Sequence, residues 1–284
     1  MIRLWLTGLL VGAGFHGARL APLGIHGGPR WDRIGKASEA RGPIVINVKG
    51  QELKMPYVLA SRTTDYYHAT ASQGQNIELA ASRLNGVVVS PGQVFSYYNV
   101  VGPYTAANGF GWGRMFVGDR IVPSVGGGVC QGSSTLYSAL LRTGLPIVER
   151  HRHGLTVPYL PPGEDATVAS TYLNFRFRNN RTTPVLISAH ARDRHITVAL
   201  WGMAPGPEIV VKHKILARYP FPVINQTNRR LNPGETKVVA PGQDGVKAES
   251  WLEIKTQKGI AIKNLGVDTY RPSPRIVERG PIGS

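Results

Sequence analysis

Three consecutive glycines, Gly126–Gly128, stand just before the only cysteine of the chain. A stretch with helical spacing follows the cysteine. The stretch reads GGGVCQGSSTLYSALLRTG, and Leu136, Ala139 and Leu140 fall on one face of the expected helix. Glycine permits backbone conformations and close approaches that larger residues forbid. The sequence therefore predicts a sharp turn that delivers Cys130 to the start of a helix.

Short strand patterns surround this helix. Glycine, with 34 copies, and proline, with 21, separate brief apolar runs, which suits a strand-rich protein with many turns. Thr171–Arg178 alternates apolar and polar residues, and Val185–Ala191 with His195–Trp201 has the pattern of a hairpin. We predict an α+β fold: a mixed, catalytic-type domain whose cysteine-bearing helix packs on an antiparallel sheet, followed by a small C-terminal all-β module.

The domain boundaries follow from shifts in composition. Arg3 precedes an apolar run, which is typical of a secretory signal peptide or an N-terminal anchor, and from Pro205 the chain turns to Lys, Pro and Gly with alternating Val and Ile. We expect four segments: a signal peptide or anchor at 1–22, a linker with a lead-in strand at 23–56, the main domain at 57–203 and the β module at 204–284.

The charge balance restricts the partners. With 33 basic and 17 acidic residues the net charge is +16, which favours an anionic partner such as an acidic wall polymer. No nucleic-acid motif accompanies the charge, so we expect no nucleic-acid partner, and contact with a membrane only through the N-terminal segment. A single cysteine excludes an internal disulfide and a multi-cysteine metal site.

Cys130 has candidate partners for thiol chemistry. A thiol reacts as the thiolate, and the unpaired N–H groups of a helix N-terminus favour that form. His151 and His153 follow the helix and, on a strand, would face the same way, so one is a candidate base and the other a candidate substrate ligand. Asp165 is the best candidate to orient the base, and Glu149 is a weaker one.

Each of these residues also has an ordinary structural interpretation. A lone cysteine is often a small buried apolar residue, and the spacing alone gives catalysis about even odds. The ERHRHG stretch is also typical of a solvated basic turn, and Asp165 of a turn residue. Two histidines with one aspartate suit zinc as well, although no further close ligand stands nearby, so we expect no metal.

The run from about Tyr57 to Gly202 resembles the VanW family, which is named from glycopeptide-resistance clusters. Three segments carry this resemblance: NIELAASRLNGVVVSPGQVFSYYNVVGPYTAANGF, VPSVGGGVCQGSSTLYSALLRTGLPIVERHRHGLTVPYLPPGEDATV and LNFRFRNN. The C-terminal part, with APGQDGVKAESW and YRPSPRIVERG, resembles a G-five domain, a β module of wall-associated proteins. Two positions depart from the VanW pattern: Gly132, where a larger residue is usual, and Asn174, where Asp is common.

The resemblance implies a secreted or envelope-associated protein that acts on peptidoglycan as an L,D-transpeptidase. Cys130 would be the nucleophile, His151 or His153 the base and Asp165 the motif aspartate. No cofactor is expected, since thiol acyl transfer needs none. The partners would be peptidoglycan stem peptides and anionic wall polymers. The alternatives are a non-catalytic peptidoglycan-binding or glycopeptide-resistance accessory protein and a cysteine hydrolase of stem peptides.

Substrate binding is expected at the glycine turn and at nearby basic side chains. Backbone N–H groups at the turn would stabilise an oxyanion, and guanidinium groups suit bidentate recognition of carboxylates. The expected substrate-binding residues are Gly127, Gly128, Gln131, Ser133, Ser134, Arg114 and Arg152.

Overall fold

The computed structural model describes residues 44–48, 50–117 and 120–281, and these form mostly β-sheets with few helices. The predicted signal or anchor at 1–22 and most of the predicted linker lie outside the described residues. Within the described ranges, no helix is long and apolar enough to cross a membrane. The helices are α1 (Ala71–Leu84), α2 (Tyr97–Val101), the short 3-10 helix η3 (Ala106–Asn108) and α3 (Val129–Leu140).

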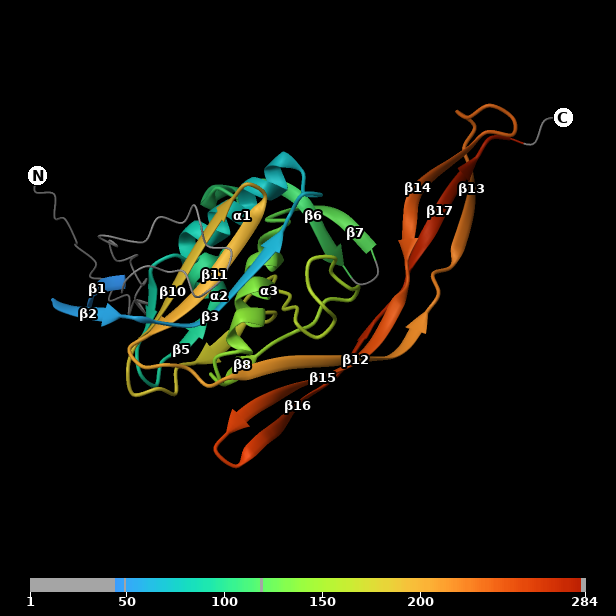
Figure 1. The fold of residues 1–284 in the computed structure, drawn as a ribbon. Helices are drawn as coiled ribbons and strands as arrows, with labels where there is room; N and C mark the ends of the chain where they lie inside the picture. Colours follow the sequence, from blue (N-terminus) through green and yellow to red (C-terminus); the bar gives the residue numbers. More distant parts are fainter. Residues whose placement is uncertain (1–43, 49, 118–119, 282–284) are drawn as a thin grey trace, which may run out of the picture.

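A four-stranded antiparallel sheet forms the centre of the first domain (Figure 1). Helices α1 and α3 pack on one face of it, α1 mainly against a middle strand and α3 against the other middle strand and the neighbouring edge strand. A hairpin of β1 (Ile44–Val48) and β2 (Gln51–Met55) lies against the other face. In order across the sheet, the strands are β3 (Tyr57–Asp65), β11 (His195–Gly202), β10 (Val185–Arg192) and β4 (Val87–Val89).

The strand alternation assigns side chains to the two faces of this sheet. On β10, Val185 and Ile187 point into the core shared with the helices, while Leu186 points toward the β1–β2 hairpin. On β11, Val198 faces the helices and Trp201 faces the hairpin. Both faces of the four-stranded sheet are covered. The predicted hairpin, which forms β10 and β11, is therefore apolar along most of its length.

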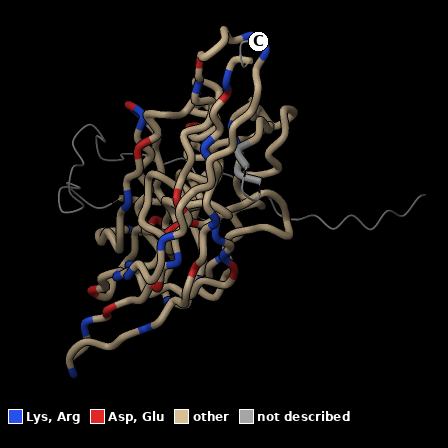
Figure 2. Tube along the Cα trace, turned by 90° about the vertical axis from the view of Figure 1, so that its right-hand side faces the viewer, with Lys and Arg blue, Asp and Glu red and all other residues tan. Residues whose placement is uncertain are grey.

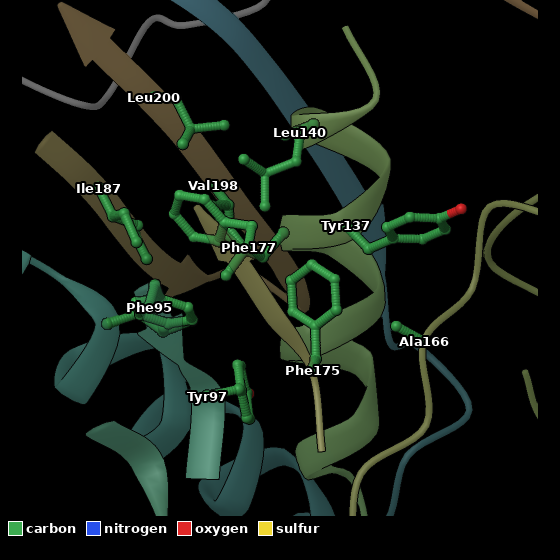
Figure 3. Close-up of a cluster of buried hydrophobic side chains, with 14 of the residues drawn as sticks. Phe95, Tyr97, Tyr137, Leu140, Ala166, Phe175, Phe177, Ile187, Val198 and Leu200 are labelled. Atoms are coloured by element: carbon green, nitrogen blue, oxygen red, sulfur yellow. The ribbon is translucent and has the colours of Figure 1, made fainter. Parts of the chain in front are cut away.

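An aromatic cluster fixes α3 on the sheet (Figure 3). Phe95 stacks on Phe177 with ring centroids 4.9 Å apart, and Tyr137 of α3 meets Phe175 edge-on at 5.6 Å. These phenylalanines lie in or beside a small antiparallel sheet. Its strands are β5 (Val94–Ser96), β9 (Arg176–Arg178) and β8 (Ile147–Glu149).

The strand expected at Thr171–Arg178 is shorter than its alternation predicts, because only Arg176–Arg178 is extended in a sheet. The hydroxyl of Ser170 accepts hydrogen bonds from the Tyr172 and Leu173 backbone N–H groups and turns the chain there. Such side-chain bonds compete with strand pairing. The segment therefore bends before it reaches the sheet.

The C-terminal module is all-β, as predicted, and consists of two three-stranded sheets. In Figure 1 the first sheet lies below the compact domain and the second points away from it. The first contains β12 (Ile209–Tyr219), β15 (Gly245–Thr256) and β16 (Gly259–Tyr270). The second contains β13 (Val223–Thr227), β17 (Ser273–Arg279) and β14 (Thr236–Gln243).

The basic residues are spread along both parts of the trace, with acidic residues among them (Figure 2).

The hairpin of β6 (Trp112–Val117) and β7 (Arg120–Val125) leads into the glycine turn before α3. This hairpin therefore brings the turn and the cysteine to the edge of the first domain.

Candidate functional site

The glycine turn exists because two backbone segments cross without side chains between them. A Cβ on Gly127 would lie 2.3 Å from the carbonyl carbon of Gly113, which is closer than any real contact. Gly128 has φ +108°, a left-handed conformation that favours glycine. The buried Asn76 amide holds the crossing, since it donates to the Gly111 and Gly127 carbonyls. The turn is therefore fixed rather than loose.

Cys130 is the second residue of α3 and is half-buried. Its thiol Sγ lies 3.2 Å from the Val168 carbonyl oxygen and 3.4 Å from the Val168 backbone nitrogen. The Thr167 hydroxyl is 3.6 Å from the same sulfur. The segment around Val168 thus fixes the position of the thiol at the helix start.

His153 and Asp165 form a buried pair beside the thiol. The His153 Nδ1 atom is 2.7 Å from Asp165 Oδ2, and the His153 backbone N–H also donates to this oxygen at 2.7 Å. His153 is 2% exposed and Asp165 1%. Two bonds to one carboxylate oxygen fix the imidazole orientation, so its other edge is directed at Cys130.

The three groups shift one another's protonation. Burial raises the pKa of the Cys130 thiol, but the hydrogen bond to His153 and the charge of His153 outweigh burial, and the pKa is lowered overall. Burial likewise opposes the imidazolium, yet the hydrogen bonds to Asp165 and Cys130 raise the pKa of His153 to about 9. The Asp165 pKa falls to about 2, against the effect of burial, because of its contacts with His153 and Arg150. These directions favour a thiolate–imidazolium pair.

The C-terminal module contributes to the same cluster. The Tyr270 hydroxyl donates to Asp165 Oδ1 at 2.5 Å and accepts from the Gly163 backbone N–H at 2.8 Å. Arg150 bridges the two modules, with 3.0 Å to Asp165 Oδ1 and 2.6 Å to Asp268 Oδ2. The sequence does not predict Tyr270 and Asp268 as members of this cluster, because nothing in the sequence of their strand indicates that it packs beside Asp165.

His151 does not join this cluster. Its Nε2 atom is 3.0 Å from Glu149 Oε1, so Glu149 contacts His151 rather than the His153 pair. Both histidines follow the end of β8, and the chain there is not a strand. The strand geometry that would point His151 and His153 the same way is therefore wrong.

A cavity of about 330 Å³ opens beside the thiol. Four of the expected substrate-binding residues line it, namely Arg114, Gly127, Gly128 and Gln131. The hydroxyls of Ser133 and Ser134 instead donate to the Ala166 carbonyl, and both serines are buried. They fasten α3 to the segment that carries Asp165, away from the cavity. Arg152 lines a second cavity, described below.

One further sequence expectation changes with the structure. Glu164, which its place beside a turn suggests is solvent-facing, is 1% exposed and pairs with Arg142 at 2.9 Å. Among the described residues, no group of three or more His, Cys, Asp or Glu side chains is arranged to hold a metal ion.

The two positions that depart from the VanW pattern are both buried. A Cβ on Gly132 would lie 2.4 Å from the Tyr97 hydroxyl oxygen, and this buried hydroxyl donates to the Val129 carbonyl. Gly132 therefore makes room for Tyr97 under the first turn of α3. The buried Asn174 amide donates to the Ser96 hydroxyl at 2.9 Å, and its Oδ1 atom accepts from the Tyr98 and Phe175 backbone N–H groups.

Comparison with known proteins gives two family matches. The model for VanW-like proteins matches residues 72–201, and the model for the G5 domain matches residues 208–281. The chain is 38% identical over 143 residues to an uncharacterized protein, YoaR, of Bacillus subtilis strain 168, covering 50% of this chain and 47% of YoaR. It is 30% identical over 112 residues to the vancomycin B-type resistance protein VanW of Enterococcus faecalis strain ATCC 700802 / V583, covering 37% of this chain and 40% of VanW.

The matched region spans less than half the length of either relative. Among solved structures, the G5 domain of IgA1 protease is 27% identical, with a TM-score of 0.19, and covers 29% of this chain and 100% of that chain. The HP0197 G5 domain is 17% identical, with a TM-score of 0.16, and covers 26% and 99%. The chain carries a VanW-like domain followed by a G5 domain.

Proposed function

We propose that this protein is a cysteine acyltransferase of the L,D-transpeptidase type that acts on peptidoglycan stem peptides. The observation that carries the proposal is the sequence of contacts from Cys130 through His153 to Asp165. A nucleophile, a base and a group that orients the base are what thiol acyl transfer requires. The lowered thiol pKa and the raised imidazole pKa support a thiolate that is present at neutral pH.

The reaction proceeds in two acyl transfers. The Cys130 thiolate attacks the carbonyl of the diamino-acid residue, a C–S bond forms, and the peptide bond to the terminal D-Ala breaks as His153 protonates the leaving amine. A side-chain amine of a second stem then attacks the thioester, a C–N bond forms, the C–S bond breaks, and the amine proton passes to His153. The Asp165 carboxylate holds the imidazole throughout.

The helix start supplies the oxyanion donor in this proposal. The Val129 and Gln131 backbone N–H groups already donate to the Gly126 and Gly128 carbonyls within the turn. This points to the Cys130 backbone N–H as the donor to the tetrahedral oxyanion. A preorganised backbone donor of this kind lowers the barrier by stabilising charge as it develops.

The setting of the reaction is proposed from the modules. A VanW-like domain with a G5 domain supports a place at the cell envelope, with stem peptides and anionic wall polymers as partners. The name of the Enterococcus faecalis relative supports a link to glycopeptide resistance. Arg114 lines the thiol cavity, which supports a role for its guanidinium in binding a carboxylate of the donor stem.

A second candidate function is a non-catalytic accessory protein that binds peptidoglycan. The same G5 module and the same relative favour it equally, with Cys130 as a structural residue. A third outcome, hydrolysis of stem peptides, uses the same thioester with water as the acceptor. These three differ only in what happens after the peptide binds.

The deciding experiment compares the full chain with Cys130→Ala on muropeptides that contain a stem tetrapeptide. We expect the full chain to form cross-linked dimers and a trapped acyl adduct on Cys130 by mass spectrometry, and the variant to form neither. Dimers that persist undiminished in Cys130→Ala would rule the mechanism out. Released D-Ala without dimers would indicate hydrolysis, and binding without any product would indicate the accessory protein.

A further inference from the structure

A second cavity, of about 510 Å³, lies where the two modules meet, and we call it the junction cavity. The VanW-like domain lines it with Arg150, His151, Arg152, Gly154 and Leu173. The G5 domain adds Asp268 and Arg271, the first within β16 and the second just after it. Neither domain alone builds this cavity.

The junction cavity carries an excess of positive charge. Arg150 is already paired with Asp165 and Asp268, whereas the Arg152 Nε atom approaches Asp268 only to 4.0 Å. Within the described residues, no hydrogen bond or ion pair of the Arg271 side chain occurs, and Arg271 is exposed. The Arg152 guanidinium also donates to the His153 carbonyl and lies over the Tyr270 ring, which leaves part of its N–H fork, together with that of Arg271, for an anion. Their planar forks suit a carboxylate bound by paired hydrogen bonds.

The junction cavity adjoins the thiol cavity. Leu173 lines both cavities, so its side chain lies between them. The chain from Arg152 to His153 also separates them, since Arg152 faces the junction cavity while His153 faces Cys130. The Arg152 guanidinium donates to the His153 carbonyl at 3.0 Å, which fixes it next to the base.

We propose that the junction cavity is the subsite for the carboxylate of the acyl acceptor, held by Arg152 and Arg271. This inference rests on the proposed transpeptidase function and adds the acceptor's chemical class. The acceptor is an amine-bearing stem peptide with a free carboxylate, and its amine would reach the Cys130 thioester past Leu173, which lines both cavities. The amine nitrogen forms the new C–N bond, the C–S bond breaks, and the amine proton passes to His153.

The test separates the two half-reactions in the full chain. Arg152→Gln, Arg271→Gln and the double variant are compared with Arg229→Gln, an exposed arginine beyond β13 in the second sheet of the G5 domain. Two acceptor peptides are used, one with free carboxylates and one with the same groups amidated. We expect the cavity variants to form the Cys130 adduct at the normal rate and to transfer it to the carboxylate acceptor about tenfold more slowly, which corresponds to the loss of one charge-assisted hydrogen bond.

Equal transfer to both acceptors by the unmodified chain, or equal loss of adduct formation in the variants, would overturn the subsite. Glycerol-phosphate oligomers distinguish the other source of an anion. Binding of these oligomers that the double variant abolishes, with unchanged acceptor preference, would show a wall-polymer site instead and also overturn the proposal.

Calorimetry keeps this inference separate from the proposed function. The carboxylate acceptor is titrated into Cys130→Ala with and without the two Arg substitutions, a measurement that needs no turnover. We expect about tenfold weaker binding without the arginines. Failure of turnover with retained Arg-dependent binding would reject the transpeptidase and keep the subsite, while Arg-independent binding would reject the subsite alone.

Discussion

Cys130, His153 and Asp165 lie in contact in this order, and each one changes the protonation of the next. The thiol pKa is lowered although burial opposes it, and the imidazole pKa is raised to about 9 although burial opposes that too. The thiolate therefore exists above the lowered thiol pKa, and the imidazolium persists until the pH passes about 9. Under the proposed mechanism, we expect acyl transfer between those two pH values.

Substitution of His153 tests this pairing. We expect His153→Ala to raise the midpoint of Cys130 alkylation by iodoacetamide, because burial is then opposed only by the contacts of the thiol with Val168 and Thr167. His151→Ala is the matched control and should leave the midpoint in place. In the unmodified chain, acyl transfer should fall as the pH rises through about 9, as the imidazolium is lost. An unshifted midpoint in His153→Ala would contradict the ion pair.

Tyr270 acts on the cluster through Asp165. We expect Tyr270→Phe to lower stability by about 1–3 kcal/mol, because the buried Gly163 N–H loses its acceptor and the carboxylate loses a donor. The pKa of Asp165 should rise, and kcat should fall more than KM rises. Urea unfolding and steady-state kinetics measure these effects. Tyr219→Phe, on the more exposed β12, is the control and should change neither.

Helix α3 is the element that joins the core to the site. Its inner face packs on the aromatic cluster in Figure 3, and its first turn carries the thiol. Gly132 lies in that turn, where alanine would ordinarily raise helix stability by up to about 1 kcal/mol. Here the close approach of the Tyr97 hydroxyl has the opposite effect.

The Gly132→Ala variant therefore has a predictable sign. We expect it to lower the free energy of unfolding by about 1–3 kcal/mol, since the added methyl group collides with a fully buried side chain. Adding Tyr97→Phe removes the hydroxyl and should recover part of the loss in a double-mutant cycle. A Gly132→Ala chain that is more stable than the unmodified chain would show that the Tyr97 hydroxyl does not obstruct a methyl group at this position.

The two modules of the whole molecule share one polar junction. Arg150 bridges Asp165 of the VanW-like domain and Asp268 of the G5 domain, and all three side chains are at least four-fifths buried. Removing one partner of such an ion pair leaves a charge without compensation. The G5 domain thereby contributes to the environment of the candidate catalytic carboxylate.

Asp268→Asn tests the junction. We expect a loss of about 1–3 kcal/mol and a calorimetric transition that splits into two, because the modules then unfold with weaker coupling. Glu208→Gln is the control, because it removes the carboxylate of an exposed ion pair, the one between Glu208 and Lys255. It should change the free energy of unfolding by less than about 1 kcal/mol. Equal effects in the two variants would mean that the junction contributes no coupling.

Local patterns in the sequence were sufficient to predict the glycine turn, the helix that starts beside Cys130 and the C-terminal β module. Each depends on neighbouring residues, through glycine conformation and apolar periodicity. The same local patterns do not predict that His153 rather than His151 lies beside Cys130. They also do not predict the contact from Tyr270 to Asp165. Both depend on how the segment after β8 folds back on α3 and on β16, through contacts between residues up to 118 positions apart in the chain. No local propensity encodes such a contact, because packing between distant segments decides which side chains share a buried space.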